Sequence, residues 1–138
     1  MSQELRVSPP HVIGPTWART IDGHWYLPER TLGWALLDWL AAYVRTPGGD
    51  HAGESFMPTL EQARFILWWY AVDENGKYIY REGLLRMLKG WGKDPLAAAF
   101  ALMELCGSVA FDYFGYTGTP IGKRRHGAWV QIAAVSQV

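Results

Sequence analysis

The interpretation of this 138-residue chain begins with residues 84–98, which read Leu84-Leu85-Arg86-Met87-Leu88-Lys89-Gly90-Trp91-Gly92-Lys93-Asp94-Pro95-Leu96-Ala97-Ala98. The apolar first part is typical of a strand, and the alanine-rich continuation, with Pro95 in its first turn, favours a helix. A second short apolar run, Trp129–Val135, is typical of a buried parallel strand. The order strand, glycine-rich turn, helix, loop and strand therefore predicts a βαβ unit.

The turn Gly90-Trp91-Gly92-Lys93 has the composition of a phosphate-binding loop. Glycines let the backbone curl around a phosphate, a helix N-terminus adds partial positive charge, and a lysine reaches the β- and γ-phosphates. Two residues depart from the usual pattern. Met87 replaces its first glycine, and Asp94 replaces the hydroxyl residue that binds Mg²⁺. An Asp oxygen can bind Mg²⁺, but its charge repels phosphate. The alternative is a structural turn with a solvated lysine.

Upstream, residues 1–30 are rich in proline and glycine and indicate an irregular leader that lies on a folded body. The segment Thr31–Val44 is predicted to be an amphipathic helix with Thr31 as its N-cap. Residues 45–58 read as a loop. A second helix is expected from Thr59, because Gln62 three residues later completes a capping box. The apolar face of this helix would consist of Leu60, Ala63, Ile66, Leu67 and Tyr70. Asp73-Glu74-Asn75-Gly76 is a turn signal that predicts a short hairpin.

The composition limits the classes of function. Thirteen Lys and Arg balance thirteen Asp and Glu, so the zero net charge gives no general indication of nucleic-acid binding. Aromatic residues make up 14% of the chain. Large rings can enlarge the core of a small domain or stack on bases, as in single-strand binders. The basic residues Lys123, Arg124 and Arg125 could contact DNA or form a solvated turn.

Other features bear on location and metal binding. No run of eighteen apolar residues exists, and the first residues contain no apolar secretory core, so a cytoplasmic protein without membrane contact is expected. The four histidines are widely spaced with no i, i+4 pair, and no metal site is predicted from them. The single cysteine, Cys106, excludes an internal disulfide.

Residues 84–98 resemble the ATPase loop of the large terminase subunits of tailed bacteriophages. Those proteins carry a variant Walker A motif with a basic residue about four positions before the lysine, which is Lys89 here. The segment Thr59–Ile66 is similar to their glutamine-containing segment, with Gln62 as the matching residue. The run Trp129–Gln137 is similar to their next ATPase strand. The helix around Gly33-Trp34 resembles the leader of actinobacteriophage-type versions. The resemblance covers residues 30–138 in the correct order.

The resemblance implies a DNA-packaging motor, an ATPase joined to an endonuclease. It implies catalytic roles for Lys93 and Lys89 and an adenine contact for Gln62. The nucleotide-binding residues would be Gln62, Gly90, Trp91, Gly92, Lys93 and Asp94, with weak DNA contacts from the basic residues 123–125. ATP and Mg²⁺ are the implied cofactors. The implied partners are phage DNA, the small terminase subunit and the portal protein, with a homo-oligomer as an option, in the cytoplasm of a phage-infected or prophage-bearing bacterial host.

The expected fold class is α/β, a partial P-loop NTPase with a parallel βαβ core preceded by an N-terminal helical leader. Residues 1–50 would form the leader arm and amphipathic helix, and residues 51–138 the N-terminal portion of the ATPase domain, ending before Walker B. Val109-Ala110-Phe111-Asp112 directly follows the loop's own helix and precedes Tyr113, not an acid. We therefore interpret it as an edge strand or loop, and ATP hydrolysis by this chain stays open. The alternatives are a non-catalytic, aromatic-rich α/β interaction module or an inert prophage remnant.

Overall fold

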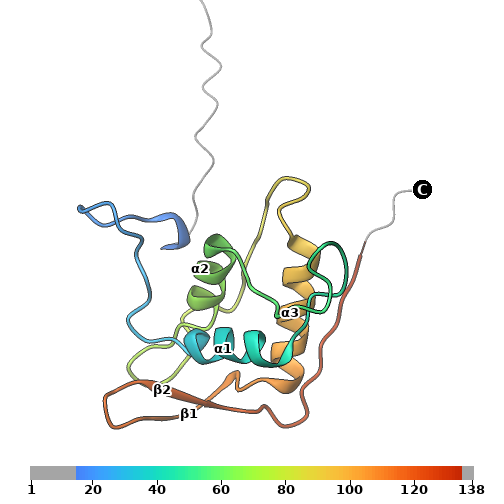
Figure 1. Cartoon of the computed structure of the whole chain (residues 1–138). Helices are drawn as coiled ribbons and strands as arrows, with labels where there is room; N and C mark the ends of the chain where they lie inside the picture. The colour runs from blue at the N-terminus through green and yellow to red at the C-terminus, as the bar shows by residue number, and fades with distance from the viewer. Residues whose placement is uncertain (1–14, 135–138) are drawn as a thin grey trace, which may run out of the picture.

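The computed structural model describes residues 15–134. Its elements follow in the order η1 (Pro15–Trp17), α1 (Gly33–Tyr43), α2 (Leu60–Trp69), α3 (Lys93–Cys106), β1 (Ala110–Phe114) and β2 (Pro120–Lys123). Figure 1 shows the three α-helices gathered together, with the β1–β2 hairpin along one side of them. Within this part of the chain, no helix is both long enough and apolar enough to cross a lipid bilayer.

Helix α1 begins at Gly33, two residues after the expected start, and its cap residue is Leu32, not Thr31. Thr31 still serves the helix start, because its hydroxyl accepts the N–H of Gly33 at 3.0 Å. The same hydroxyl donates to the carbonyl of Leu67 at 2.6 Å and so ties α1 to α2. A Cβ on Gly33 would lie 2.8 Å from Leu67 Cα. Only glycine therefore allows the two helices to approach this closely.

Helix α2 begins with the predicted capping box, which is confirmed. The Thr59 hydroxyl accepts the N–H of Gln62 at 3.2 Å, and Gln62 Oε1 accepts the N–H of Thr59 at 3.0 Å. These two bonds satisfy backbone donors that a helix start otherwise leaves unpaired. The expected apolar face is only partly buried. Ile66 and Leu67 are buried, whereas Leu60, two turns before Leu67, is 82% exposed.

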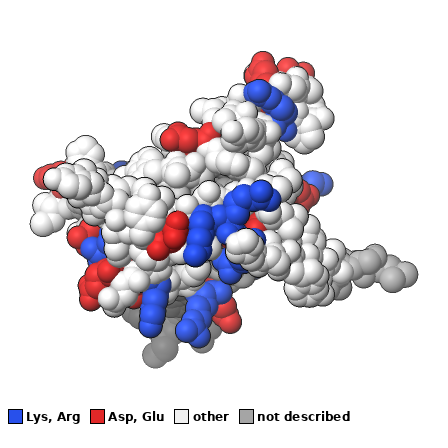
Figure 2. All heavy atoms as spheres, turned by 90° about the horizontal axis from the view of Figure 1, so that it is seen from below, with Lys and Arg blue, Asp and Glu red and all other residues white. Residues whose placement is uncertain are grey.

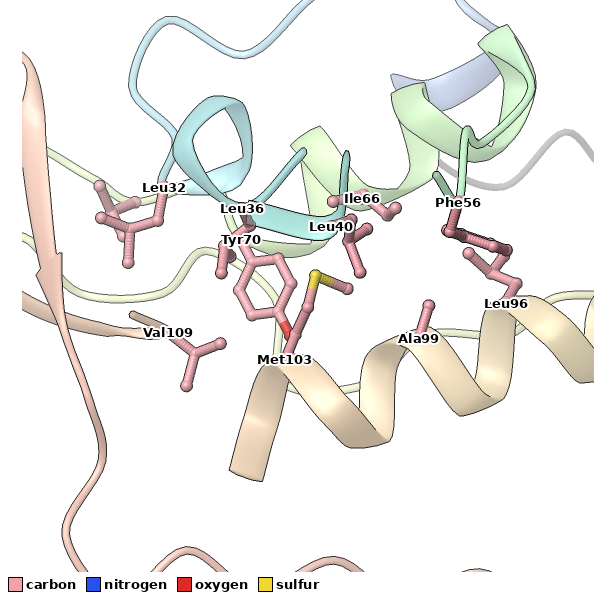
Figure 3. Packing of buried hydrophobic residues seen from close by; sticks show 11 residues of the cluster. Leu32, Leu36, Leu40, Phe56, Ile66, Tyr70, Leu96, Ala99, Met103 and Val109 are labelled. Atoms are coloured by element: carbon pink, nitrogen blue, oxygen red, sulfur yellow. The ribbon is translucent and has the colours of Figure 1, made fainter. Parts of the chain in front are cut away.

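The core lies between α3 and the pair formed by α1 and α2. Leu36 and Leu40 of α1 are buried one turn apart, and Leu96 and Met103 of α3 face them across the core. Figure 3 shows the side chains of this cluster converging between the helices. The buried cluster consists of Leu32, Leu36, Leu40, Phe56, Ile66, Tyr70, Val72, Leu96, Ala99, Met103 and Val109. One apolar stripe of each helix thus enters a common core.

The prediction of a partial P-loop NTPase with a parallel βαβ sheet is wrong for this chain. Within residues 15–134, the sheet is a two-stranded antiparallel hairpin in which Ala110 pairs with Lys123 and Phe114 with Pro120. Residues 84–88 and 129–134 contain no strand, and Val135 lies outside the described residues. A buried parallel strand needs hydrogen-bonded neighbours and cover on both faces. Leu84 and Leu88 have neither here and are 85% and 87% exposed.

The structure agrees with the predictions for the turn at residues 73–76 and for residues 109–112. The turn at residues 73–76 closes a minimal hairpin, in which Val72 and Tyr78 form a single antiparallel bridge. Asp73 Oδ1 accepts the N–H groups of Asn75 and Lys77 at 2.8 and 3.0 Å, and these bonds hold the pKa of Asp73 below its ordinary value. Residues 110–112 lie in β1, and Asp112 faces Lys123 at 3.9 Å. That position agrees with the edge-strand interpretation of this segment.

A polar network joins the chain after β2 to the helices. The Tyr70 hydroxyl donates to Glu104 Oε1 at 2.8 Å, and Arg125 lies 3.7 Å from the other oxygen of the same carboxylate. Burial raises the pKa of Tyr70 far above its ordinary value, and the neighbouring charge of Glu104 raises it further. The network thus connects α2, α3 and the segment after β2 through one carboxylate.

We expect Leu40→Ala to lower the free energy of unfolding by about 2–5 kcal/mol, because Leu40 is completely buried and the truncation leaves a cavity. Urea denaturation followed by circular dichroism measures the change. Tyr43→Ala is the matched control on the same helix, since Tyr43 is 74% exposed, and its effect should stay within about 0.5 kcal/mol. Equal effects of the two substitutions would contradict the assigned core.

We expect Tyr70→Phe to lower the free energy of unfolding at neutral pH by about 1–3 kcal/mol, because it removes a hydrogen bond to a charged group. The raised pKa of Tyr70 also makes the wild-type protein less stable as the pH rises above about 10, where the unfolded phenol ionises but the folded one does not. Urea titrations between neutral pH and about pH 11 should show a shallower alkaline decline in Tyr70→Phe than in the exposed control Tyr113→Phe. An identical alkaline decline in the free energy of unfolding of the two variants would show that burial does not raise the pKa of Tyr70.

Candidate functional site

The glycine-rich loop lies directly before α3, as the sequence predicts. Lys89 and Gly90 form a turn in which Trp91 N–H donates to the carbonyl of Leu88 at 3.3 Å, and Gly92 is the N-cap of α3. The helix then begins at Lys93, so the lysine is its first residue. The strand expected before the loop is absent from the described residues, which leaves a loop-and-helix unit in place of a βαβ unit.

Both glycines of the loop are required by its backbone. Gly90 and Gly92 have φ values of +88° and +94°, a region that side-chain-bearing residues rarely adopt. Gly92 is constrained a second time, because a Cβ there would lie 2.8 Å from Gln62 Nε2. The conformation of the loop and its close approach to α2 therefore both select glycine at this position.

Gln62 contacts the loop directly. Its Nε2 donates to the carbonyl of Trp91 at 3.1 Å, across 29 residues of sequence, and the side chain is 6% exposed. The adjacent Glu61 accepts the indole N–H of Trp91 at 2.8 Å. Two consecutive residues in the first turn of α2 thus hold Trp91 from its backbone and its ring. The structure thus brings Gln62 into contact with the loop. The sequence alone shows only that Gln62 precedes the loop along the chain.

The two lysines of the loop lie in different surroundings. Lys93 is partly buried, and its Nζ donates to the carbonyl of Met87 at 2.5 Å, so the ammonium group folds back across the base of the loop. Lys89 is exposed, and no hydrogen bond or ion pair of its side chain is recorded among residues 15–134. One lysine therefore orders the loop, while the other is available to an incoming anion.

The start of α3 also provides backbone donors. Leu96 N–H bonds to the carbonyl of Gly92 at 3.1 Å, which is the first intrahelical bond. The N–H groups of Lys93 and Asp94 precede that bond and have no acceptor among the described residues. Such unpaired donors, with the positive end of the helix dipole, are suited to an anion. Asp94 is exposed in the same turn, and its carboxylate is a side-chain oxygen ligand that Mg²⁺ could use.

The predicted DNA-contacting residues lie elsewhere. Lys123 faces Asp112, Arg124 is exposed, and Arg125 contacts Glu104 near the C-terminal end of α3. Glu104 lies eleven positions after Lys93 on this helix, which corresponds to about 16 Å along its axis. The basic residues 123–125 therefore do not belong to the loop site.

Two further groups shape this site and belong to no motif in the sequence. Glu61 holds the Trp91 indole, and the Met87 carbonyl receives Lys93. The only sequence signal for Glu61 is its position beside Gln62 in the first turn of a capped helix. No side-chain signal could identify Met87, because its contribution is a backbone oxygen.

Comparison with known proteins gives relatives but no described function. No protein-family model matches the chain, and no solved structure matches it. It is similar to the "Gene 13 protein" of Mycobacterium phage L5, with 56% identity over 152 aligned positions that include 97% of the chain. It is also similar to the "Gene 13 protein" of Mycobacterium phage D29, with 54% identity over 154 positions and the same share. The chain spans about a quarter (26%) of the length of each relative.

Proposed function

We propose that this chain is part of the large terminase subunit of a tailed phage and that its glycine-rich loop binds the phosphates of ATP. Two observations support this proposal, one for the terminase family and one for a phage origin alone. One is the resemblance of three ordered motifs to large terminase subunits. The other is the similarity to mycobacteriophage proteins about four times the length of the chain. DNA packaging, cleavage and contacts with phage DNA, the small subunit and the portal protein belong to this proposal for the whole protein.

The observation that carries the proposal is the hydrogen bond from Gln62 Nε2 to the carbonyl of Trp91. A primary amide has two N–H donors and a carbonyl with two lone pairs. Gln62 uses one donor on the loop and one lone pair on Thr59 N–H, and it is 6% exposed, so in the proposed complex it acts by holding the loop in position. The contact explains how a glutamine 31 residues before Lys93 can act on the same site as the lysine.

In the proposed complex the phosphates lie at the start of α3. The unpaired N–H groups of Lys93 and Asp94 donate to phosphate oxygens, and Lys89 adds positive charge from the exposed side. Lys93 exchanges its bond with the Met87 carbonyl for a bond with phosphate. Mg²⁺, where bound, would neutralise phosphate charge, and Asp94 is the residue of the loop that could hold it. This arrangement depends on the loop and α3 and does not require a parallel sheet.

We expect Lys93→Met to weaken Mg-ATP binding at least about tenfold, because it removes a charge-assisted hydrogen bond while keeping the apolar stem. Isothermal titration calorimetry of Mg-ATP into the wild-type chain and the variant measures the change. Arg86→Met is the matched control, since Arg86 is exposed and lies outside the loop. Circular dichroism of each variant confirms that α3 is retained. No saturable binding by the wild type, or equal binding by wild type and Lys93→Met, would refute the proposal.

We expect Asp94→Asn to tighten ATP binding about two- to fivefold in the presence of a chelator, because one negative charge beside the phosphates is removed. The same substitution should lower the free energy of unfolding by about 0.3–1 kcal/mol, because an acidic residue in the first turn stabilises a helix. Calorimetry and urea denaturation measure the two effects. Glu74→Gln, in an exposed turn, is the control and should change neither quantity. Unchanged or weaker ATP binding by Asp94→Asn would place the phosphates away from the start of α3.

A further inference from the structure

A cleft of about 760 Å³ lies beside the C-terminal half of α3. The glycine-rich loop lies at the other end of this helix. Its walls come from α2, from α3, from the segment after the residue 73–76 turn and from the chain beyond β2. This volume is in the range of known ligand pockets. Neither the loop residues 89–93 nor Gln62 line it. The cleft is therefore a second candidate site, separate from the proposed nucleotide loop.

Aromatic rings form most of the cleft wall. The Phe100 ring meets the rings of Phe65 and Trp69 edge to face, with centroids 5.8 and 6.4 Å apart. Tyr80 and Trp129 also line the cleft, and Trp129 is 80% exposed. Phe65, Trp69 and Phe100 are only half-buried, so ring surface faces the cleft without a protein cover. Such surfaces are suited to stacking with another planar ring.

The charges around the cleft are predominantly positive. Lys77, Arg81 and Arg125 line it, against the single carboxylate of Glu104. Glu104 is already occupied by the Tyr70 hydroxyl and by Arg125. Lys77 and Arg81 are exposed and form no ion pair within residues 15–134, and the nearest acidic influence on Lys77 is the charge of Asp73. Figure 2, which views the molecule from below, shows Lys and Arg side chains in the middle of that face, with some Asp and Glu side chains beside them. A molecule of zero net charge thus presents a locally basic surface.

We propose that this cleft binds a segment of single-stranded nucleic acid. Bases would stack on Trp129 and on the ring surface of the wall, and the neighbouring phosphates would contact Lys77 and Arg81. Aromatic platforms combined with a positively charged groove are the means by which proteins hold unpaired strands. A duplex does not fit this description, because its bases are already stacked on each other. The proposal rests on the cleft alone and is independent of ATP binding at the loop.

Fluorescence anisotropy at low salt with a labelled oligothymidylate tests the proposal. An oligonucleotide of about ten nucleotides lies within the usual site size of ~4–16 nucleotides. We expect saturable binding by the wild-type chain and at least about fivefold weaker binding by Trp129→Ala, which loses a stacking surface. Trp129 is 80% exposed, so its substitution leaves the fold intact. Tyr116→Ala is the matched control, because Tyr116 is fully exposed and does not line the cleft.

The charges are tested by salt dependence. Each lost phosphate contact lowers the slope of log affinity against log salt by about 0.7 for a single strand. The double variant with Lys77→Ala and Arg81→Ala should therefore show a slope reduced by about 1.4, whereas Arg86→Ala should show no change. A purely structural role of these residues would not alter this slope.

Four outcomes would overturn the proposal. The first is the absence of oligonucleotide binding at low salt. The second is equal or tighter binding of the same sequence as a duplex, and the third is complete competition by thymidine monophosphate at equal nucleotide concentration. The fourth is a loss of oligonucleotide binding in Lys93→Met equal to that in Trp129→Ala, which would locate the strand at the loop. Because Lys93→Met should otherwise bind the oligonucleotide normally, failure of this proposal and failure of ATP binding are distinguishable.

Discussion

The packing of α3 against α1 and α2 is the constraint on which both candidate sites depend. Leu96, Ala99 and Met103 form one stripe on α3, and each is at most 2% exposed. A helix is stiff, so fixing this stripe fixes both of its ends. The N-terminal end carries the glycine-rich loop, and the C-terminal half carries Phe100 and Glu104 of the cleft. Loss of this contact would therefore displace both sites at once.

The helices were predictable because their signals are local. Thr59 and Gln62 specify the start of α2 through bonds within one turn, and the structure contains both bonds. Alanine-rich sequence after Pro95 and a glycine at position 107 indicate the course and end of α3, and Gly107 is its C-cap. The predicted N-cap of α1 was wrong by one residue, since Leu32 and not Thr31 holds this position. Thr31 nevertheless accepts the N–H of Gly33 with its hydroxyl.

The strands were not predictable, because their stability depends on neighbours distant in sequence. Residues 84–88 and 129–134 are apolar enough for a buried strand, but composition does not supply a pairing partner. Without one, these segments have no ladder hydrogen bonds, and Leu88 and Ile132 are 87% and 76% exposed. Conversely, the sequence indicates residues 109–112 only as an edge strand or loop, and it indicates no partner strand at β2. The two strands pair because the turn at residues 115–119 closes on itself through a 2.8 Å bond from Gly115 N–H to the Thr119 carbonyl.

The candidate site shows how far a motif can be interpreted without a structure. Gln62 is explained by helix capping alone, so its presence after Thr59 carries no information about a ligand. Its Nε2 atom is different, because capping uses only Oε1. That free end reaches the Trp91 carbonyl, and the approach requires the absence of a side chain at Gly92. The two segments are therefore linked by Gln62 Nε2, which helix capping does not use, and by Gly92, whose missing side chain leaves room for this contact. This tertiary pairing, and not either motif alone, is the structural support for our proposal that phosphate binds at the start of α3.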